Sequence, residues 1–403
     1  MNAAQQLIAK FHALFHSAAA VYRAPGRVNL IGEHTDYNEG FVLPTAIQFS
    51  CWAAMAPRED RKLVIHSENF HETAESDLDD LIPTPDGAWS DYALGVAWAL
   101  EQGGNRLRGA NIYIAGDVPL GAGLSSSASI EVAVGYGLME MSGYPIDRTA
   151  LALLCQRAEN EFVGARCGIM DQFVSCHGRA DHALLLDCRS LEMRMLPVPP
   201  EVALIICNTM VKHELGTSEY NERRADCEEA VRLLGAVLPG TRALRDVTAA
   251  QLEEHRGFLP EKIYKRAHHV ITENARVLQT ATAFENVEME KLGRLMADSH
   301  RSLREDYQVS CSELDTMVEI AVRQRGVFGA RMTGGGFGGC TINLVDAAHA
   351  PEFQQKVAAA YRSATGLPPD IYVCQASQGA EAVKANPEIA GNAAATRIAR
   401  ENP

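Results

Sequence analysis

The sequence predicts an α+β protein built from two domains. A chain of 403 residues is longer than a single hydrophobic core usually supports. Strand-like and helix-like segments both occur, but they lack the regular βαβ alternation that a dinucleotide-binding fold requires. Near Pro197 a group of strand-like segments is followed by helix-like ones. We therefore expect an N-terminal domain at residues 1–196 and a C-terminal domain at residues 197–403.

Composition places the chain among ordinary globular proteins. Hydrophobic residues make up 47% and charged residues 22%, which argues against disorder and against a coiled coil. A net charge of −14 without an extended Lys/Arg cluster argues against a nucleic-acid partner. The ten cysteines are scattered along the chain, which is typical of buried reduced thiols and not of disulfides or a zinc site.

The first twenty residues predict a helix, with Leu7, Phe11, Leu14 and Phe15 on one face. Polar residues interrupt this stretch and no basic residue precedes Lys10, so we do not interpret it as a signal peptide. No apolar run reaches the length of a membrane span. We expect a cytoplasmic, monomeric protein without a membrane or nucleic-acid partner.

A charged turn follows this helix. Residues 27–31 predict a strand that breaks at Gly32. Arg27 is a planar cation suited to phosphate oxygens. The polar residues after Gly32 supply acceptors of the kind that hold sugar hydroxyls, namely Glu33, His34 and Asp36. The alternative is a surface turn in which Asp36 caps the local backbone.

Further strands are predicted at residues 51–55 and 63–66, followed by an acidic connection that reaches Pro85. Trp89 to Leu100 predicts a buried helix. These elements carry no motif of their own, and their predicted role is to build the core of the first domain.

A glycine-rich turn at Pro119–Ser129 joins a strand-like segment at 111–115 to a helix-like segment at 130–138. Such a turn points backbone N–H groups at its occupant, and the helix dipole adds partial positive charge, so the natural occupant is an anion. Gly121 and Gly123 allow close approach of the backbone. The turn matches neither the Walker loop nor the dinucleotide fingerprint. A phosphate site and an ordinary Gly/Ser turn therefore both stay open.

Two isolated acids, Glu159 and Asp171, follow the turn. A helix is predicted from Asp147 to Gly164, and Glu159 lies near its C-terminal end, where the helix dipole disfavours a negative charge. This carboxylate is either solvated or held by a cation. Asp171 lies among apolar residues, where acids are rare unless they are paired. The alternative for Asp171 is an N-cap of the following segment.

The rest of the chain predicts strands, then helices, then strands around a second glycine turn. The predicted segments are strands at 183–186, 193–197 and 202–207, helices that begin at Ser218, Pro260 and Met289, a helix from its cap Ser312 to Arg325, strands at 327–332 and 340–345, and a last strand at 371–375. Thr333–Gly339 holds five glycines in seven residues. Such a segment is not a packed element, so its glycines allow either close approach of the backbone to another group or a strained backbone conformation. The Ala-rich tail from Gly379 is either loosely held or packed back on the N-terminal domain.

Three of these segments resemble motifs of one family. Residues 26–37, GRVNLIGEHTDY, resemble the galactokinase signature. The turn at Pro119 resembles the ATP loop of the wider GHMP kinase superfamily, and Thr333–Cys340, TGGGFGGC, resembles its C-terminal motif. The three motifs occur in the family's order and spread over most of the chain.

The resemblance implies a two-domain GHMP kinase fold with the active site in the cleft between the domains. The implied reaction transfers the γ-phosphoryl group of ATP to the anomeric hydroxyl of D-galactose and gives galactose 1-phosphate. Arg27 and Asp171 would be catalytic, the first stabilising charge in transfer and the second orienting or deprotonating the sugar hydroxyl. The implied cofactors are ATP and Mg²⁺, with Ser127 and Glu159 around the metal.

The same resemblance implies the binding residues. Those for the nucleotide are Pro119, Gly121, Gly123, Leu124, Ser125, Ser126, Ser127 and Ala128. Those for the sugar are Glu33, His34, Asp36, Gly168, Asp171 and Tyr220. Trp89 and Tyr92 are candidates to flank the adenine, although aromatic residues at helical spacing more often belong to the core.

Two related functions stay open. One is an N-acetylgalactosamine kinase, and the other is a regulator that senses galactose and ATP without turnover. Sensors of this family lack a Ser-Ala element in the ATP loop, which this chain retains as Ser127-Ala128. That favours a working enzyme.

Overall fold

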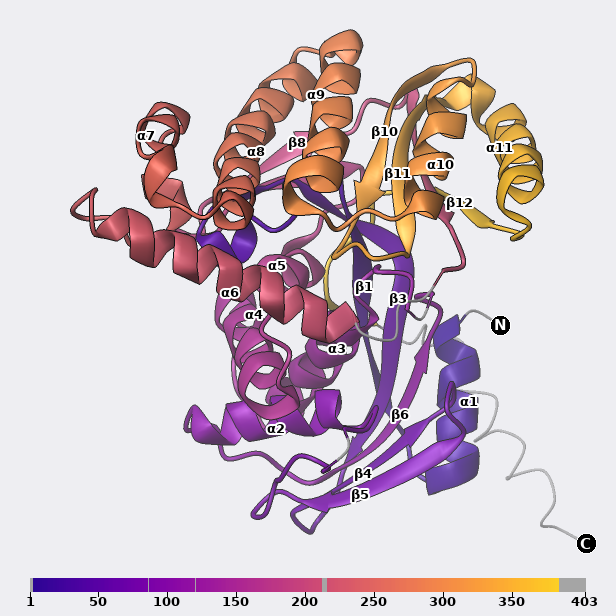
Figure 1. Cartoon of the computed structure of the whole chain (residues 1–403). Coiled ribbons are helices and arrows are strands. Elements are labelled where there is room, and N and C mark those ends of the chain that lie inside the picture. Colours follow the sequence, from indigo (N-terminus) through magenta and orange to yellow (C-terminus); the bar gives the residue numbers. More distant parts are fainter. Residues whose placement is uncertain (1–2, 86, 120, 212–215, 384–403) are drawn as a thin grey trace, which may run out of the picture.

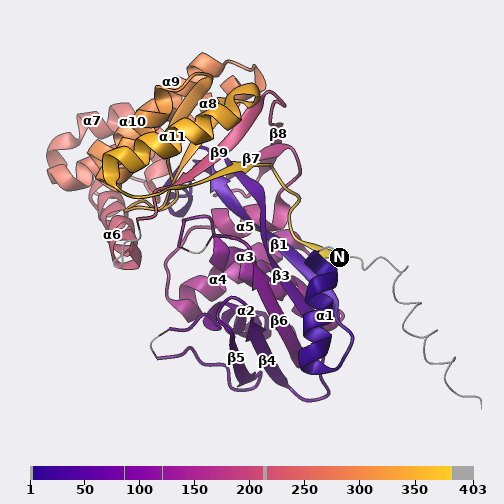
Figure 2. The ribbon, with the colours of Figure 1, turned by 90° about the vertical axis from the view of Figure 1, so that its right-hand side faces the viewer.

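A computed structural model describes residues 3–85, 87–119, 121–211 and 216–383. Two lobes lie one above the other, each with a sheet and covering helices (Figure 1, Figure 2). Strand β1 (Ala20–Asn29) runs from the first lobe to the junction with the second. Both lobes mix helices with mainly antiparallel sheets, as expected for the α+β class.

The first lobe is built on a six-stranded sheet of order β13-β1-β3-β6-β4-β5. Besides β1, its strands are β3 (Pro44–Pro57), β4 (Lys62–Ser67), β5 (Glu72–Asp77), β6 (Ala110–Gly116) and β13 (Glu381–Val383). Successive side chains of a strand point to opposite faces. Tyr22 and Met55 accordingly belong to the core on one face, whereas Val21 and Ala54 belong to the core on the other.

Helices cover both faces of this sheet. One face packs against α1 (Ala3–Phe15), and the other packs against α2 (Asp91–Gln102), α3 (Ser126–Met141), α4 (Arg148–Arg157) and α5 (Met170–His177). Leu14, which the sequence places on the apolar face of α1, is 44% exposed, and Phe15 makes the contact with the core in the last turn.

The second lobe is built on a four-stranded antiparallel sheet of order β10-β11-β9-β12. Its strands are β9 (Val202–Asn208), β10 (Val327–Thr333), β11 (Cys340–Asp346) and β12 (Asp370–Cys374). Its helices are α6 (Gly216–Gly235), α7 (Ala249–Glu254), α8 (Glu261–Glu285), α9 (Met289–Ser302), α10 (Ser312–Val322) and α11 (Ala350–Thr365). α10 and α11 pack on one face, and α8 and α9 on the other.

A shared core joins the two lobes. Val28 and Ile47 from the first lobe lie in the same buried cluster as Leu204 and Ile342 from the second. A small third sheet lies beside it, made of β2 (Phe41–Val42), β7 (His182–Asp187) and β8 (Met193–Pro197). The predicted domain boundary between residues 196 and 197 falls at the end of β8 and stays a prediction.

Several helices and strands were not predicted from the sequence, or were predicted with other bounds. β5 occupies part of the predicted acidic connection, because an edge strand that pairs on one side alone can carry charged, exposed residues. α7 and α11 have no counterpart among the predicted helices. Ser312 is the first residue of α10 and not its cap, which is Cys311. The helix predicted from Asp147 ends in a π-helical turn, Ala158–Val163.

The strand predicted at 371–375 is not the last one. Glu381–Val383 forms β13, which pairs with β1 in the first lobe. These residues of the tail are therefore held in a sheet and not loose, and the remainder of the tail lies outside the described residues.

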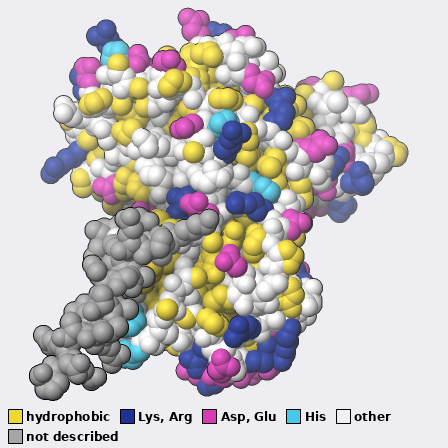
Figure 3. Space-filling view, turned by 180° about the vertical axis from the view of Figure 1, so that it is seen from behind, with side chains coloured by type: hydrophobic (Ala, Val, Ile, Leu, Met, Phe, Trp, Pro, Cys, Tyr) yellow, Lys and Arg dark blue, Asp and Glu magenta, His cyan; other side chains and the backbone are white. Residues whose placement is uncertain are grey.

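Across the described ranges, no helix is both long enough and apolar enough to span a membrane. On the face in Figure 3, Lys and Arg lie scattered among Asp and Glu.

Candidate active site

Strand β1 changes register just before Arg27. The pairing of β1 with β3 shifts between Pro25 and Arg27, and the Arg27 N–H donates instead to the Leu124 carbonyl, at 3.1 Å. A side chain at Gly26 would place its Cβ 2.6 Å from the same carbonyl oxygen, so glycine is required there. Bulges commonly redirect a side chain beside an active site. Here the bulge brings β1 against the glycine-rich turn and directs Arg27 toward α5.

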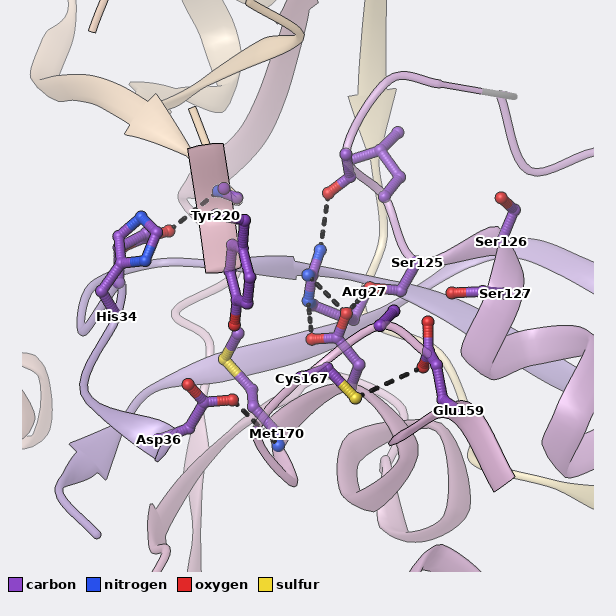
Figure 4. Close-up of a pocket in the computed structure, with 18 of the residues that line it drawn as sticks. Arg27, His34, Asp36, Ser125, Ser126, Ser127, Glu159, Cys167, Met170 and Tyr220 are labelled. Atoms are coloured by element: carbon purple, nitrogen blue, oxygen red, sulfur yellow. Dashed lines mark hydrogen bonds and ion pairs between the residues drawn. The ribbon is translucent and has the colours of Figure 1, made fainter. Parts of the chain in front are cut away.

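Arg27 and Asp171 form a two-pronged ion pair. The Arg27 Nε and Nη2 each lie 2.7 Å from one Asp171 carboxylate oxygen, and Nη1 donates to the Gly123 carbonyl at 2.6 Å (Figure 4). The Ser125 hydroxyl donates to the same carboxylate. The alternative role of Asp171 as an N-cap is wrong, because it lies in the first turn of α5 and Ile169 occupies the cap position.

The glycine-rich turn adopts the conformations that its glycines predict. Gly121 and Gly123 have φ of 70° and 73°, and Ser125 has φ of 60°, all in the left-handed region. Ser126 then begins α3, so its first turn faces the cavity. The second glycine turn lies against this loop, since a Cβ on Gly334 would lie 3.2 Å from the Gly123 carbonyl oxygen. Residues of both turns line the same cavity.

Glu159 lies at the start of the π-helical turn Ala158–Val163 and faces the loop. Its carboxylate accepts hydrogen bonds from Gln172 Nε2 at 2.5 Å and from the Cys167 thiol at 3.5 Å, and the nearby Ser127 hydroxyl acts to lower its pKa. Burial, with a contribution from the Asp171 charge, raises the pKa of Glu159 to about 7. Among the described residues no cation pairs with Glu159, and a buried carboxylate next to a hydroxyl and a phosphate-type loop is a donor set that fits a hard divalent cation. Ser127 and Glu159 therefore fit the predicted metal.

Asp36 depends on Gly168 for its place. Its carboxylate accepts from the Tyr37 N–H at 2.9 Å and from the Met170 N–H at 3.4 Å. Any side chain at Gly168 would overlap this carboxylate. Burial and the Asp171 charge raise the pKa of Asp36 to about 6. Asp36 is thus a confined acceptor that gains its charge near neutral pH.

Glu33 is buried against the second lobe. Its carboxylate pairs with Arg331, a fully buried arginine of β10, and accepts from the Gly334 N–H at 3.1 Å and the Thr333 hydroxyl at 3.2 Å. Burial raises the pKa of Glu33, against the opposing effect of Arg331. Glu33 therefore borders the cavity and also ties the charged turn to the second glycine turn.

His34 lies in an aromatic cluster with Tyr37, Tyr220 and Tyr307. The His34 ring centroid is 4.6 Å from that of Tyr307 and 5.5 Å from that of Tyr220. Burial lowers the pKa of His34 to about 3, so the ring is neutral. Tyr220 stands between His34 and the Arg27–Asp171 pair in Figure 4. A neutral ring surrounded by aromatic faces suits a polyol better than an ion.

One cavity of about 360 Å³ collects these groups. Of the predicted site residues, those that line it are Arg27, Glu33, His34, Asp36, Gly121, Gly123, Leu124, Ser125, Ser126, Ser127, Glu159, Gly168, Asp171 and Tyr220. Pro119 and Ala128 are not among them, since the Ala128 side chain is buried in the core. Arg27 is the one lysine or arginine among the described lining residues.

Sequence reasoning missed some of the lining. Cys167, Met170, Asn221, Gly334 and Gly335 also face the cavity. Most of them carry no functional group that would single them out. Gly334 and Gly335 belong to the second glycine turn, which the resemblance to the GHMP kinase C-terminal motif already implies to lie beside the ATP loop.

A smaller apolar pocket opens beside the start of α3. Trp89 and Phe70 stack there with ring centroids 5.9 Å apart and planes at 12°, and Ser126 borders the same pocket. Tyr92 does not line it and lies instead near Glu159. Of the two aromatic candidates for a base-stacking site, only Trp89 is therefore in a suitable place.

Comparison with family models finds three matches in order along the chain. Residues 9–57 match the galactokinase galactose-binding signature, residues 91–179 match the GHMP kinase N-terminal domain, and residues 280–363 match the GHMP kinase C-terminal domain. They cover the charged turn, the glycine-rich loop and the second glycine turn, the three segments that form the cavity.

Curated relatives and solved structures agree with these matches. A galactokinase of Roseiflexus sp. is 49% identical over 366 residues, covering 91% of this chain and 93% of its own length, and one of Chloroflexus aurantiacus is 45% identical, covering 95% and 98%. The structure of Lactococcus lactis galactokinase complexed with galactose superposes with a TM-score of 0.92 at 36% identity, over 95% of this chain and all of that one. A mevalonate kinase, at 18% identity and a TM-score of 0.61, shares the fold. The chain belongs to the galactokinase family of the GHMP kinases.

Proposed function

We propose that this protein transfers the γ-phosphoryl group of ATP to the anomeric hydroxyl of D-galactose and forms galactose 1-phosphate. The observation that carries the proposal is the position of the Arg27–Asp171 pair. Within one cavity, the pair lies between the glycine-rich turn at the N-terminus of α3, which suits phosphate, and the polar side chains of the charged turn, which suit sugar hydroxyls. Phosphoryl transfer depends mostly on positioning and charge neutralisation, which such a junction provides.

The nucleotide's phosphates would lie at the start of α3. Backbone N–H groups of a glycine-rich turn and a helix N-terminus favour anions. Ser127 and Glu159 would hold Mg²⁺, which supplies positive charge to the β- and γ-phosphates when bound. The apolar pocket that Trp89 and Phe70 line beside Ser126 is the proposed place for the adenine ring.

Asp171 would accept a hydrogen bond from the anomeric hydroxyl and take its proton as the phosphoryl group arrives. Both carboxylate oxygens are already oriented by Arg27, so the acceptor is held in one geometry. Three of the five guanidinium N–H groups are engaged by Asp171 and Gly123, and the remaining ones are available to the transferring phosphoryl group.

The sugar would lie between the charged turn and Tyr220. Asp36 is confined there as an acceptor, and His34 has a buried nitrogen, Nε2, without a hydrogen bond among the described residues. A site that hydrogen-bonds one orientation of a hydroxyl leaves buried groups unpaired when an epimer binds. We therefore expect galactose to be strongly preferred over glucose.

A coupled assay of ADP release with ATP, Mg²⁺ and a panel of sugars tests the proposal. We expect galactose turnover at about 1–100 s⁻¹, the usual range of kinases. N-Acetylgalactosamine turned over with equal kcat/KM would move the assignment to that kinase. Purified, folded protein that binds galactose and ATP but forms no sugar phosphate over hours would be a sensor and not an enzyme.

We further propose that the protein works as a monomer in the cytoplasm. All ten cysteines are free, and most are buried, which suits a reducing compartment. Light scattering behind size exclusion would test the monomer, and a fluorescent fusion would test the location.

A further inference from the structure

A buried bridge of polar side chains lies behind Glu159. Gln172, in α5, donates from Nε2 to Glu159 Oε2 at 2.5 Å and to Oε2 of Glu131, in α3, at 3.0 Å. Gln172 and Glu131 are both fully buried, and neither is among the residues that line the cavity. Glu131 lies one helical turn after Ser127, on the same side of α3. The bridge therefore connects α3, α5 and the π-helical turn that carries Glu159.

The orientation of the Gln172 amide follows from its two neighbours. Its nitrogen faces two carboxyl groups, and a third contact of that nitrogen, with Cys167 Sγ, is longer at 3.8 Å. The reverse orientation would set the amide oxygen against Glu159, whose carboxylate can only accept once it is ionised, as a cation ligand must be. The two amide hydrogens are thus directed to Glu131 and Glu159.

The bridge gives the two carboxylate oxygens of Glu159 different surroundings. Oε2 receives both the Gln172 amide, at 2.5 Å, and the Cys167 thiol, at 3.5 Å. In Figure 4 the other oxygen points toward Ser127 and away from Cys167. Hydrogen-bond partners behind a metal ligand orient it and tune its affinity for the metal. One oxygen is therefore held by the protein, and the other is left beside the Ser127 hydroxyl.

Glu131 is costly for the stability of the fold. Within the described ranges no lysine or arginine pairs with it, and its Oε1 is buried there without a hydrogen-bond partner. Burial, with a contribution from Glu159, raises the pKa of Glu131 well above its usual range, so this acid accepts the amide hydrogen without adding a second charge. An apolar side chain would avoid the cost, which is accounted for if the contact serves to hold Gln172 in place.

We propose that Gln172, held by Glu131, is a positioning residue that fixes Glu159 through Oε2 and leaves the other oxygen, beside Ser127, to bind a divalent cation. The part that concerns the cation rests on the proposed function. The alternative is a polar contact that only stabilises the packing of α3 against α5. The first role predicts that variants of the bridge lose cation affinity, whereas the second predicts a loss of stability alone.

Binding of Mn²⁺ tests the proposal without substrate or turnover. Mn²⁺ takes the same oxygen ligands as Mg²⁺, and electron paramagnetic resonance measures the concentration of the free ion. The binding that is lost in Glu159→Gln identifies the site. We expect Gln172→Met, which keeps the length of the side chain but cannot donate, to weaken binding at this site about tenfold. Unchanged affinity in Gln172→Met, or the absence of any binding that depends on Glu159, would overturn the proposal.

Two comparisons separate positioning from general stability. Glu131→Gln keeps an oxygen that can accept from Gln172 and should retain the wild-type Mn²⁺ affinity, whereas Glu131→Met should lose affinity as Gln172→Met does. An equal loss in both Glu131 variants would refute the role of this oxygen. The matched control is Asn343→Leu, which removes another fully buried amide, bonded to the Ile205 carbonyl at 2.9 Å in the second lobe. It should lower the melting temperature with unchanged Mn²⁺ affinity, and a similar loss of affinity there would mean that stability alone explains the effect.

A crystal structure of metal-free Gln172→Met shows the orientation directly. The Glu159 carboxylate should turn away from its wild-type position, and an unchanged orientation would refute the role of Gln172. In steady-state kinetics the Mg²⁺ concentration for half-maximal rate should rise about tenfold in this variant, with an unchanged KM for galactose, because the bridge lies outside the cavity. Absence of galactose turnover by the wild type would instead refute the proposed function and leave the Mn²⁺ and crystallographic results standing.

Discussion

Asp171 has both carboxylate oxygens bonded to Arg27, and this pairing decides what the acid can do. The ion pair keeps the carboxylate in one orientation at the meeting point of the loop and the charged turn. An acid held this way suits orientation of a hydroxyl, with proton acceptance late in the reaction.

Asp171→Asn should reduce kcat by at least about 10²-fold, because the amide keeps the size of the side chain but cannot accept the proton. The dissociation constants for galactose and ATP, measured by calorimetry, should change only a few-fold. If sugar binding disappeared together with turnover, Asp171 would have a structural role and no catalytic one.

Gly168→Ala should raise the KM for galactose by about tenfold or more while kcat falls less, because the added methyl group displaces the Asp36 carboxylate from its place. Gly257→Ala is the matched control, since the space around that glycine is open. Equal kinetics for both variants would show that the position of Asp36 does not matter for the sugar.

Galactose binding should depend on pH through Asp36. Burial and the neighbouring Asp171 raise the pKa of Asp36 to about 6, against the opposing effect of Arg27, so the carboxylate is protonated below pH 6 and ionised above it. As an acceptor it should therefore bind the sugar more weakly as pH falls from 7 to 5. Calorimetry without nucleotide measures this, and Asp36→Asn should flatten the profile. An unchanged affinity across this range in the wild type would refute the assignment.

At the scale of elements, irregular segments carry the functional groups. The bulge of β1 directs Arg27, and π-helical turns hold both Glu159 and Tyr307. Such turns occur frequently at functional sites, because an extra residue per turn changes the direction of a side chain. The regular parts of β1, α4 and α9 serve to anchor these turns in the core.

The buried pair of Glu33 and Arg331 connects two such elements, the turn after β1 and strand β10. Arg331→Met should lower the free energy of unfolding by about 3–5 kcal/mol, because it leaves the Glu33 carboxylate buried without its partner. Urea denaturation measures the loss. The double variant Glu33→Gln, Arg331→Met should recover part of it.

Arg323→Met is the control for this experiment. Its pair with Glu319 is exposed and 3.8 Å long, so its removal should cost less than about 1 kcal/mol. A similar, small loss in Arg331→Met would mean that the buried pair does not hold the two elements together.

At the scale of the molecule, the cavity is lined from both lobes. Gly334 and Gly335 come from the second lobe, whereas Arg27 and the loop come from the first. A ligand in this place binds the folded protein and not the unfolded chain, so it stabilises the fold by about 2.7 kcal/mol at a hundred times its dissociation constant.

Galactose should accordingly raise the melting temperature in a concentration-dependent way, and glucose at the same concentrations should raise it much less. Differential scanning calorimetry without nucleotide measures both. Equal shifts from the two sugars would contradict a site that distinguishes the epimers.

The sequence by itself determined the family, most of the regular elements and most of the residues that line the cavity. Short motifs such as GRVNLIGEHTDY and the two glycine turns carry that information locally, because turn conformation and helix starts depend on neighbouring residues. The same locality explains the misses. β13 is an edge strand whose pairing partner, β1, lies at the other end of the chain, so no local pattern predicts it. β5 pairs with its neighbour β4, but its charged, exposed residues lack the apolar alternation that marks a strand.

Only the tertiary structure decided which groups meet. Asp36 and Gly168 are far apart in sequence, yet the space left by one glycine accommodates the other residue's carboxylate. The pKa of His34 is likewise lowered by burial, and its ring packs against Tyr307 from a distant segment of the chain. Burial and hydrogen-bond partners set these properties, and both arise when distant segments pack together, so they cannot be read from the order of residues alone.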